Sequence, residues 1–389
     1  MVEIKNIVNV NFDVVTTLPA TSSYPNILYV KKGDATTEPQ KSALTYSVFT
    51  NICRNGTVYE MSAKSLDGDD GTKAATKILD YKKSKFGTSE DFICVVIDET
   101  LLTTGSDNTH GTYYTLPSGL VSLTQETNVP APYKMMFFTS MCYDTAKIVT
   151  TDVTKPSQVE YAIANMNNVD CVGVMVYAGT EISTKVPAME LAAYLCNINL
   201  DESTAFSDIT YTDMSAVKTD VPATDVGSSY SELSKIANFN DIITKNFVLF
   251  GGNMTNGVPI TTQFGAICAE NDVVSAALNA MLNKLPLNDN GLATVVSYIN
   301  DRLVRYINNG YLNQNTTYSG VTEVSSYNSS NVRLISKKQA LPQGYLIATI
   351  PMMYLTATDR ASKTFTPIYV YMETLSGART IQINGKILA

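Results

Sequence analysis

Both ends of this 389-residue chain show the alternation of apolar and polar residues that is typical of β-strands. The apolar positions that carry the pattern are Ile4, Val8 and Val10 in the first segment and Ile381, Ile383 and Ile387 in the last. Most chains fray at their ends, whereas a strand must find partners for its backbone N–H and C=O groups. The terminal segments therefore either close a sheet within their own domain or are donated to a neighbouring subunit.

Between the ends, strand-like and helix-like segments alternate along the chain. The strand-like runs are Phe92–Ile97, Lys134–Met141 and Cys171–Tyr177, and the helical stretches are Thr72–Phe86, Ser157–Met166 and Val186–Asn197. Such alternation predicts a partly parallel sheet that is covered by helices. The polar stretch Thr210–Tyr230 follows and has the composition of a linker or an exposed loop.

The last part of the chain contains the two strongest helical patterns. In Asn271–Leu285 and Leu292–Asn309, apolar residues recur at helical spacing and form one continuous stripe on each helix. After the Ser/Asn-rich stretch Asn313–Asn331 come three long β segments, which are Gly344–Leu355, Phe365–Thr374 and Ala378–Leu388. These segments indicate a second unit that combines helices with a sheet.

One edge of the second helical stripe carries Tyr298, Arg302 and Arg305. Their spacings of four and three residues place the three side chains on the same flank of the helix. Two arginines on one helix edge of an acidic protein form either an ordinary solvated face or a contact for an acidic partner. We take this flank as a candidate contact surface.

Together these patterns predict an α/β (α+β) protein of several domains, with mixed β-sheets flanked by helices and extended strand-like arms. We divide the chain into an N-terminal strand arm and linker (1–25), an α/β region (26–225), a second domain with the two amphipathic helices (226–375) and a C-terminal strand arm (376–389). The length is ample for more than one buried core.

The sequence lacks the usual patterns of catalytic and metal sites. The single histidine, His110, lies in a Gly/Ser/Thr/Asn-rich stretch, which is a poor place to hold a catalytic base. The six cysteines are too far apart for zinc-type spacing, and we expect buried free thiols in a reducing place of synthesis. The glycine-rich stretch Gly251–Gly257 lacks the Lys-Ser/Thr ending of a phosphate loop. We expect no catalytic residue, no metal and no cofactor, although an enzyme with a carboxylate-only site stays open.

The charge and the hydropathy of the chain argue against nucleic acid and membranes as binding partners. The chain has 28 basic and 36 acidic side chains, a formal net charge of −8, and no long basic run. This balance argues against direct nucleic-acid binding. No apolar run approaches the length that spans a bilayer, so we expect no membrane insertion, and the N-terminus has no secretory pattern.

The C-terminal half resembles the tail sheath proteins of contractile-tailed bacteriophages. The features that carry the resemblance are the Phe247–Gly252 strand, the two helices with the Asp289-Asn290-Gly291 turn between them, the Tyr306–Gly310 helix end, the Thr358-Asp359-Arg360 segment and the closing strand pair around Ser376–Arg379 and Ile383-Asn384-Gly385. The opening Asn6–Val10 strand fits the same pattern. The resemblance covers about the first 20 residues and residues 230–389.

The resemblance implies an assembly protein whose subunits stack in rings around a tail tube and shorten to drive the tube through the host envelope. In such a protein, residues 226–375 would form the sheath core, residues 26–225 an outward-facing variable domain, and the terminal arms would exchange strands between subunits. The implied partners are further copies of the chain, the tail tube protein, and baseplate and tail terminator proteins, in a virion assembled in the host cytoplasm. The alternatives are a baseplate or tube component and, from a different class, an α/β enzyme.

Overall fold

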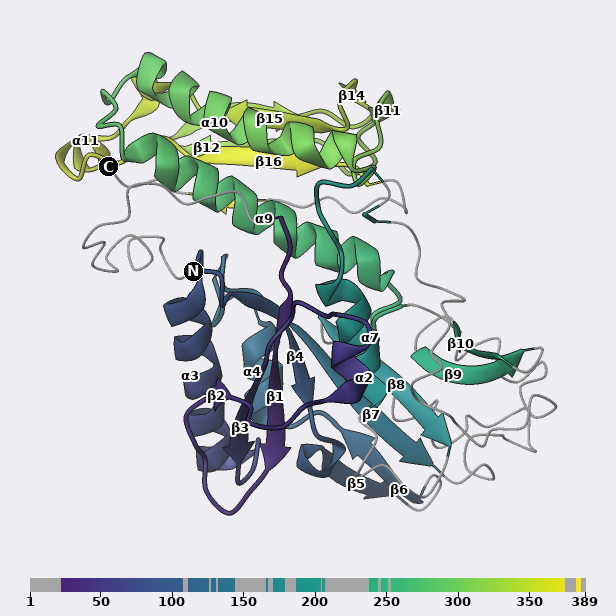
Figure 1. Cartoon of the computed structure of the whole chain (residues 1–389). Helices are drawn as coiled ribbons and strands as arrows, with labels where there is room; N and C mark the ends of the chain where they lie inside the picture. The colour runs from purple at the N-terminus through teal and green to yellow at the C-terminus, as the bar shows by residue number, and fades with distance from the viewer. Residues whose placement is uncertain are drawn as a thin grey trace.

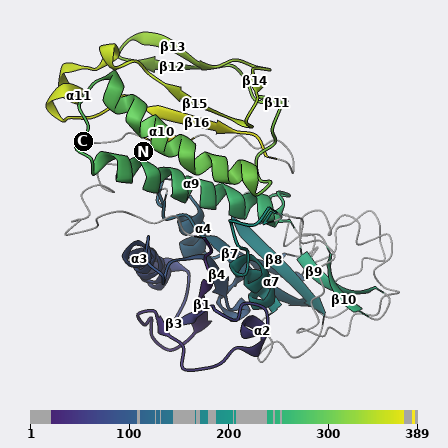
Figure 2. The ribbon, with the colours of Figure 1, turned by 45° about the horizontal axis from the view of Figure 1, so that its top comes forward.

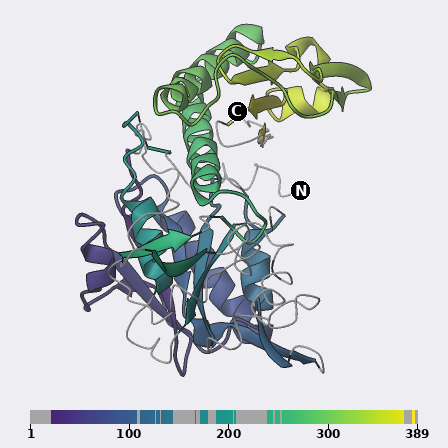
Figure 3. The same cartoon turned by 90° about the vertical axis from the view of Figure 1, so that its right-hand side faces the viewer.

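The computed structural model describes residues 22–107, 111–125, 127–130, 132–143, 166, 171–178, 187–203, 205–206, 238–243, 246–250, 253–374 and 383–385. Within these residues, a larger α/β unit and a smaller α+β unit lie on either side of one long helix, α9 (Figure 1). Figure 3 shows the same arrangement from the side, with α9 between the two units. The predicted fold class, mixed α/β with several sheets and helices, is confirmed.

The α/β unit is built on one eight-stranded sheet with the order β10-β9-β8-β7-β4-β1-β3-β2. The six inner strands are parallel: β1 (Asn26–Lys32), β3 (Val58–Ala63), β4 (Phe92–Ile97), β7 (Met136–Tyr143), β8 (Val172–Ala178) and β9 (Asn238–Ile243). The edge strands β2 (Gln40–Lys41) and β10 (Asn246–Phe250) are antiparallel to their neighbours. The chain moves outward from β1 to β3 and then restarts at β4 on the other side, which is the doubly wound topology.

The inner strands form where the sequence is continuously apolar, because both faces of the sheet are covered. All six residues of β4 are buried, and so are the first five of β1. Alternate β1 residues enter different cores: Ile27 packs with α7 (Pro187–Cys196) and α2 (Ser47–Thr50), whereas Leu28 packs with α3 (Gly68–Lys85) and α4 (Ser118–Thr124). Continuous runs of this kind are typical of parallel strands buried on both faces.

The short helix η1 (Glu99–Leu101) follows β4 at the carboxyl edge of this sheet, and a hairpin of β5 (Thr103–Asp107) and β6 (Gly111–Thr115) follows it. At the same edge, Asp67 precedes α3 and accepts hydrogen bonds from the Ser118 backbone N–H and the Thr103 hydroxyl. The acidic turn that precedes α3 therefore links the start of α3 to the start of α4 through hydrogen bonds.

Helix α9 (Ile260–Met281) crosses the amino edge of the sheet. Its side chains meet residues that lie just before three strands: Gln263 donates to Cys171 Sγ before β8 (3.0 Å), Glu270 pairs with Lys134 before β7 (2.9 Å) and Asn271 donates to the Tyr24 hydroxyl before β1 (3.4 Å). Almost every residue of α9 is buried, since the α/β unit covers one side and α10 the other.

The smaller unit has three layers (Figure 2). Helix α10 (Asp289–Asn308) packs on one face of the sheet β15-β16-β17, whose strands are Tyr345–Thr349, Ile368–Met372 and Ile383–Gly385. The hairpin of β12 (Glu323–Tyr327) and β13 (Ser330–Ile335) covers the other face. A two-stranded pair, β11 (Thr316–Thr317) with β14 (Ala340–Leu341), and the short helices η3 (Met352–Tyr354) and α11 (Ala357–Ala361) complete this unit.

Several predicted elements are confirmed, and the differences have physical reasons. The predicted β4 agrees with the structure, and β7, β8, α3, α7 and α10 agree within a few residues. Of the helix predicted at Ser157–Met166, only Met166 lies among the described residues. Helix α9 begins eleven residues before the predicted Asn271, because a helix that is buried all round shows no amphipathic stripe there. The boundary at residue 226 leaves β9 and β10 in the second domain, whereas β9 pairs with β8 of the first.

Candidate assembly surfaces

The flank of α10 that carries Tyr298, Arg302 and Arg305 faces α9 and the α/β unit. Arg305 Nη2 lies 2.9 Å from Asp201 Oδ1, in the segment after α7, and Arg305 Nη1 lies 3.3 Å from Asp272 Oδ2 in α9. Only 13% of the Arg305 side chain is exposed. This arginine therefore ties three segments of its own chain together.

The Asp272 carboxylate is the buried centre of this cluster. It also accepts a hydrogen bond of 2.8 Å from the Tyr306 hydroxyl, and Tyr306 is fully buried. Burial raises the pKa of Asp272, against the lowering effect of the Tyr306 hydrogen bond and of the positive charges on Arg305 and Arg302. A buried carboxylate of this kind depends on its partners, since an unpaired buried charge is costly.

The other two residues of the flank keep part of their surface accessible. Tyr298 is 37% exposed, and its hydroxyl accepts a hydrogen bond of 3.0 Å from the Asn283 side chain at the end of α9. Arg302 is partly exposed. A contact with a tail tube through this flank stays a prediction, and in this structure Tyr298 and Arg302 are better placed for it than Arg305.

The C-terminal strand pairs within its own chain over the residues that the structure describes. Strand β17 is antiparallel to β16, with Ile383 opposite Val370 and Gly385 opposite Ile368. Ile381 and Ile387 lie outside the described residues, as do Ile4, Val8 and Val10 of the N-terminal segment. Exchange of strands between subunits therefore stays a prediction.

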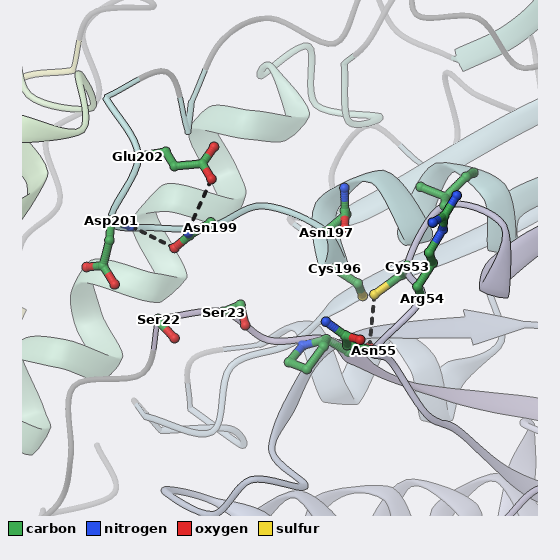
Figure 4. A pocket seen from close by; sticks show the side chains of 12 residues that line it. Ser22, Ser23, Cys53, Arg54, Asn55, Cys196, Asn197, Asn199, Asp201 and Glu202 are labelled. Carbon is green, nitrogen blue, oxygen red and sulfur yellow. Dashed lines mark hydrogen bonds between the residues drawn. The ribbon is translucent and has the colours of Figure 1, made fainter.

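A polar cavity of about 710 Å³ lies at the amino edge of the large sheet, between the segment before β1 and the end of α7 (Figure 4). Its wall includes Cys53 and Cys196, whose thiols donate to the backbone oxygens of Pro25 (3.5 Å) and Asn26 (3.6 Å). Burial raises the pKa of Cys53 to about 11 and raises that of Cys196 as well. These thiols are thus protonated at neutral pH, which is the opposite of what an activated nucleophile requires.

The cavity also lies opposite the place where doubly wound folds bind ligands, which is the carboxyl edge beside the switch from β1 to β4. Glu99 lies near that point, and its Oε2 atom has no hydrogen-bond partner among the residues described here. Burial, with a smaller effect of Asp98, raises the pKa of Glu99 to about 7. His110 is outside the described residues.

The structure describes the side chains of most of the cysteines and of the other residue types that can bind a metal ion. Cys53, Cys94, Cys171, Cys196 and Cys268 are buried and free, as predicted. The described ranges contain no group of three His, Cys, Asp or Glu side chains that could hold a metal ion. They also contain no helix with the length and hydropathy needed to cross a membrane.

A buried ion pair at the amino edge was not predicted from the sequence. Lys82 of α3 has no exposed surface, and its Nζ lies 2.5 Å from both Asp91 Oδ1 and the backbone oxygen of Phe92. The Asn26 side chain donates to the backbone oxygens of Ser89 and Asp91 in the same region. Lys82 stands among other lysines near the helix end, so the sequence offers no sign that it is the buried one.

Comparisons with known proteins show the fold. No family model matches the sequence, and no curated protein matches it. Among solved structures, this chain is similar to a chain in the cryo-EM structure of the anti-feeding prophage (AFP) baseplate, 6-fold symmetrised. The TM-score is 0.53 at 14% sequence identity, and the match covers 95% of this chain and 94% of that chain. The fold is therefore shared over nearly the whole length of both chains.

Proposed function

We propose that this chain is a structural subunit of a phage-type contractile tail, and that it forms the tail sheath. The observation that carries the proposal is the fold shared with a chain of a prophage baseplate structure across 95% of this chain, both units included. The sequence resemblance to tail sheath proteins, which rests mainly on residues 230–389, points to the same class of assembly.

Two features of the structure suit an assembly role. Helix α9 is held between the two units by hydrogen bonds, by the Lys134–Glu270 pair and by the Arg305–Asp272 pair, so the subunit can transmit force as one body. Strand β17, with three described residues, lies at one edge of the β15-β16-β17 sheet, and a sheet edge is a template for another strand. In a sheath, these sheets would join neighbouring subunits, and the tube, baseplate and tail terminator proteins would be the further partners in the virion.

A component of the baseplate is the second candidate, because the similar structure is itself a baseplate. The two candidates differ in how copies of the chain associate. Sheath subunits form a contact that repeats without closing along the tail axis, whereas a baseplate component forms at most one closed ring.

Negative-stain electron microscopy of the purified full-length chain tests the proposal. We expect open-ended tubes or stacked rings at high protein concentration, since a sheath can polymerise without other proteins. Single rings without stacking would favour the baseplate candidate. Discrete monomers over the whole accessible concentration range would contradict both.

A further inference from the structure

The hairpin β12–β13 presents an outer surface whose one charged side chain, Arg333, is basic. Its side chains alternate between the two faces: Tyr327 and Val332 point inward and pack against the β15-β16-β17 sheet. Val324 and Arg333 lie opposite each other in register, and both are exposed, Val324 to 52%. The outer face thus combines an apolar and a basic side chain at its middle.

The same surface continues past the end of β13. The Lys337 backbone N–H donates to Thr322 Oγ1 (2.9 Å) and the Lys338 backbone N–H to the Tyr318 oxygen (3.2 Å), so the turn that carries both lysines lies against the segment that leads into β12 through Val321. Both lysines are exposed, and Val321 is 68% exposed. We call Val321, Val324, Arg333, Lys337 and Lys338 together the hairpin face.

The acidic side chains of this region are turned inward, and hydrogen bonds occupy them. Glu323 accepts from the hydroxyls of Tyr318 (3.1 Å) and Tyr371 (2.9 Å). Asp359 accepts from the hydroxyl of Tyr327 (2.6 Å), and Glu373 accepts from the Ser319 backbone N–H (2.7 Å). Since no ion pair joins these carboxylates to Arg333, Lys337 or Lys338, the hairpin face keeps its positive charge.

The positive charge of this region contrasts with the rest of the chain. Residues 311–374 contain five basic side chains and three acidic ones, so the remaining residues hold 23 basic and 33 acidic side chains, a net charge of −10. The five basic residues are all exposed and form no ion pair with any residue that the structure describes, and they are Arg333, Lys337, Lys338, Arg360 and Lys363. Residues 311–374 therefore carry a net charge opposite in sign to that of the rest of the chain.

We propose that the hairpin face binds the acidic surface of a second copy of this chain. The contact joins two different surfaces, so it is head-to-tail and can repeat from copy to copy. Val321 and Val324 supply an apolar centre, and the three basic side chains supply charge that sets orientation and association rate. This proposal rests on the proposed function, because it assumes that copies of the chain assemble, and it names one of the contacts between them.

The test compares self-association of the full-length chain with that of the variant Arg333→Glu/Lys337→Glu/Lys338→Glu, by sedimentation velocity at low and high salt. We expect association of the variant to be weaker by about tenfold or more at low salt, because attraction becomes repulsion at three positions. Salt should weaken association of the unmodified chain and have much less effect on the variant. Circular dichroism should show the same thermal midpoint for both proteins.

The matched control is Lys64→Glu/Lys73→Glu/Lys83→Glu, which makes the same change of charge on exposed lysines of the α/β unit. It should associate at least as well as the unmodified chain. Should the triple variant of the hairpin face not fold, the single variant Val324→Glu places an acidic charge at the centre of the same surface and should weaken association in the same direction.

The outcomes separate this inference from the proposed function. If tubes form and the hairpin variants form them equally well, the inference is wrong and the sheath assignment stands. If the chain associates in a way that depends on salt and on Arg333 but forms no tubes or rings, the contact is right and the sheath assignment fails. If the chain does not associate at any salt concentration, both fail.

Discussion

Arg305 of α10 and Asp272 of α9 face each other with 3.3 Å between Nη1 and Oδ2, and the same guanidinium reaches Asp201 of the α/β unit. The pair therefore links both units through the helix that separates them. Only 5% of the Asp272 side chain is exposed, so the pair is screened from solvent. In the proposed sheath subunit, this cluster would hold one unit in place relative to the other.

Removing the arginine from this cluster should destabilise the protein. The variant Arg305→Met leaves Asp272 buried with Tyr306 as its remaining hydrogen-bond donor in the cluster, and breaking a buried pair costs about 3–5 kcal/mol. Urea unfolding measures the change. The control Asp201→Asn alters the exposed partner of the same arginine, whose side chain is 61% exposed, and should change the free energy of unfolding by less than about 1 kcal/mol. Equal effects of the two variants would contradict the buried role of Asp272.

The buried pair of Lys82 and Asp91 gives a second stability prediction. Lys82→Ala should destabilise the α/β unit by about 3–5 kcal/mol, because Asp91 is only 3% exposed and would lose its cation. Lys83→Ala is the control on the neighbouring position, where 41% of the lysine side chain is exposed, and should cost less than about 1 kcal/mol. Thermal unfolding that moves equally in both variants would show that Lys82 is not buried.

The raised pKa of Glu99 leads to a prediction of how the free energy of unfolding depends on pH. Its pKa is raised to about 7 in the folded chain from an ordinary value of 4.5, so the folded state binds more protons in this interval. The free energy of unfolding should therefore fall as pH rises from 4.5 to about 7 and stay level above it. Because the carboxyl is partly solvated, Glu99→Gln should stabilise the chain above pH 7 by on the order of 1 kcal/mol.

Unfolding curves at several pH values check this prediction. The control Glu202→Gln changes an exposed glutamate and should alter stability by less than about 0.5 kcal/mol at each pH. A Glu99→Gln variant that is destabilised above pH 7 would show that the carboxylate has a partner that stabilises its charge.

The tube contact is best tested through Arg302 alone. Arg302→Glu reverses the charge on the accessible part of the α10 flank and leaves the pairs of Arg305 in place. If the chain forms a sheath as proposed, this variant should bind its tube more weakly in a co-sedimentation assay, whereas Arg305→Glu would also disturb the fold. Normal sheathing of tubes by Arg302→Glu at both low and high salt would contradict the assignment of this flank.

Deletion of residues 1–14 separates the two roles of the N-terminal segment. Donation of Ile4, Val8 and Val10 to a neighbouring subunit predicts a folded monomer with an unchanged thermal midpoint that cannot polymerise. Pairing within the same chain predicts a destabilised or insoluble protein, because a sheet would lose a strand. The second result would overturn strand exchange.

The sequence predicted those strands and helices whose apolar residues follow a clear local spacing. Strand β4 was identified because six consecutive apolar residues are buried on both faces, and α10 was identified because its stripe faces one core. Strands β1 and β3, which lie between β4 and the edge strand β2, were not identified, since their apolar runs are short and contain Tyr29, Glu60 and Ser62. Within β3, the Glu60 carboxylate pairs with Lys31 of the neighbouring strand β1, and such a paired polar residue breaks the apolar pattern.

The candidate site was less predictable. The shared flank of Tyr298, Arg302 and Arg305 followed from helical spacing, but the partners of Arg305 lie about 30 and 100 residues away along the chain, where spacing carries no information. The positive charge of the hairpin face could not be predicted either, because it depends on contacts between residues that are far apart in the sequence. Residues 313–331 look like a polar loop, and only the fold shows that the Tyr hydroxyls hold Glu323 and Asp359 inward.

The most direct test of the central claim is cryo-electron microscopy of polymers formed by the purified full-length chain, followed by helical reconstruction. The account predicts hollow tubes of indefinite length, in which each copy has the α/β and α+β units arranged around α9 as described and contacts copies in its own ring and in the next ring. Closed single rings, or particles that stay monomeric at every concentration, would contradict a sheath.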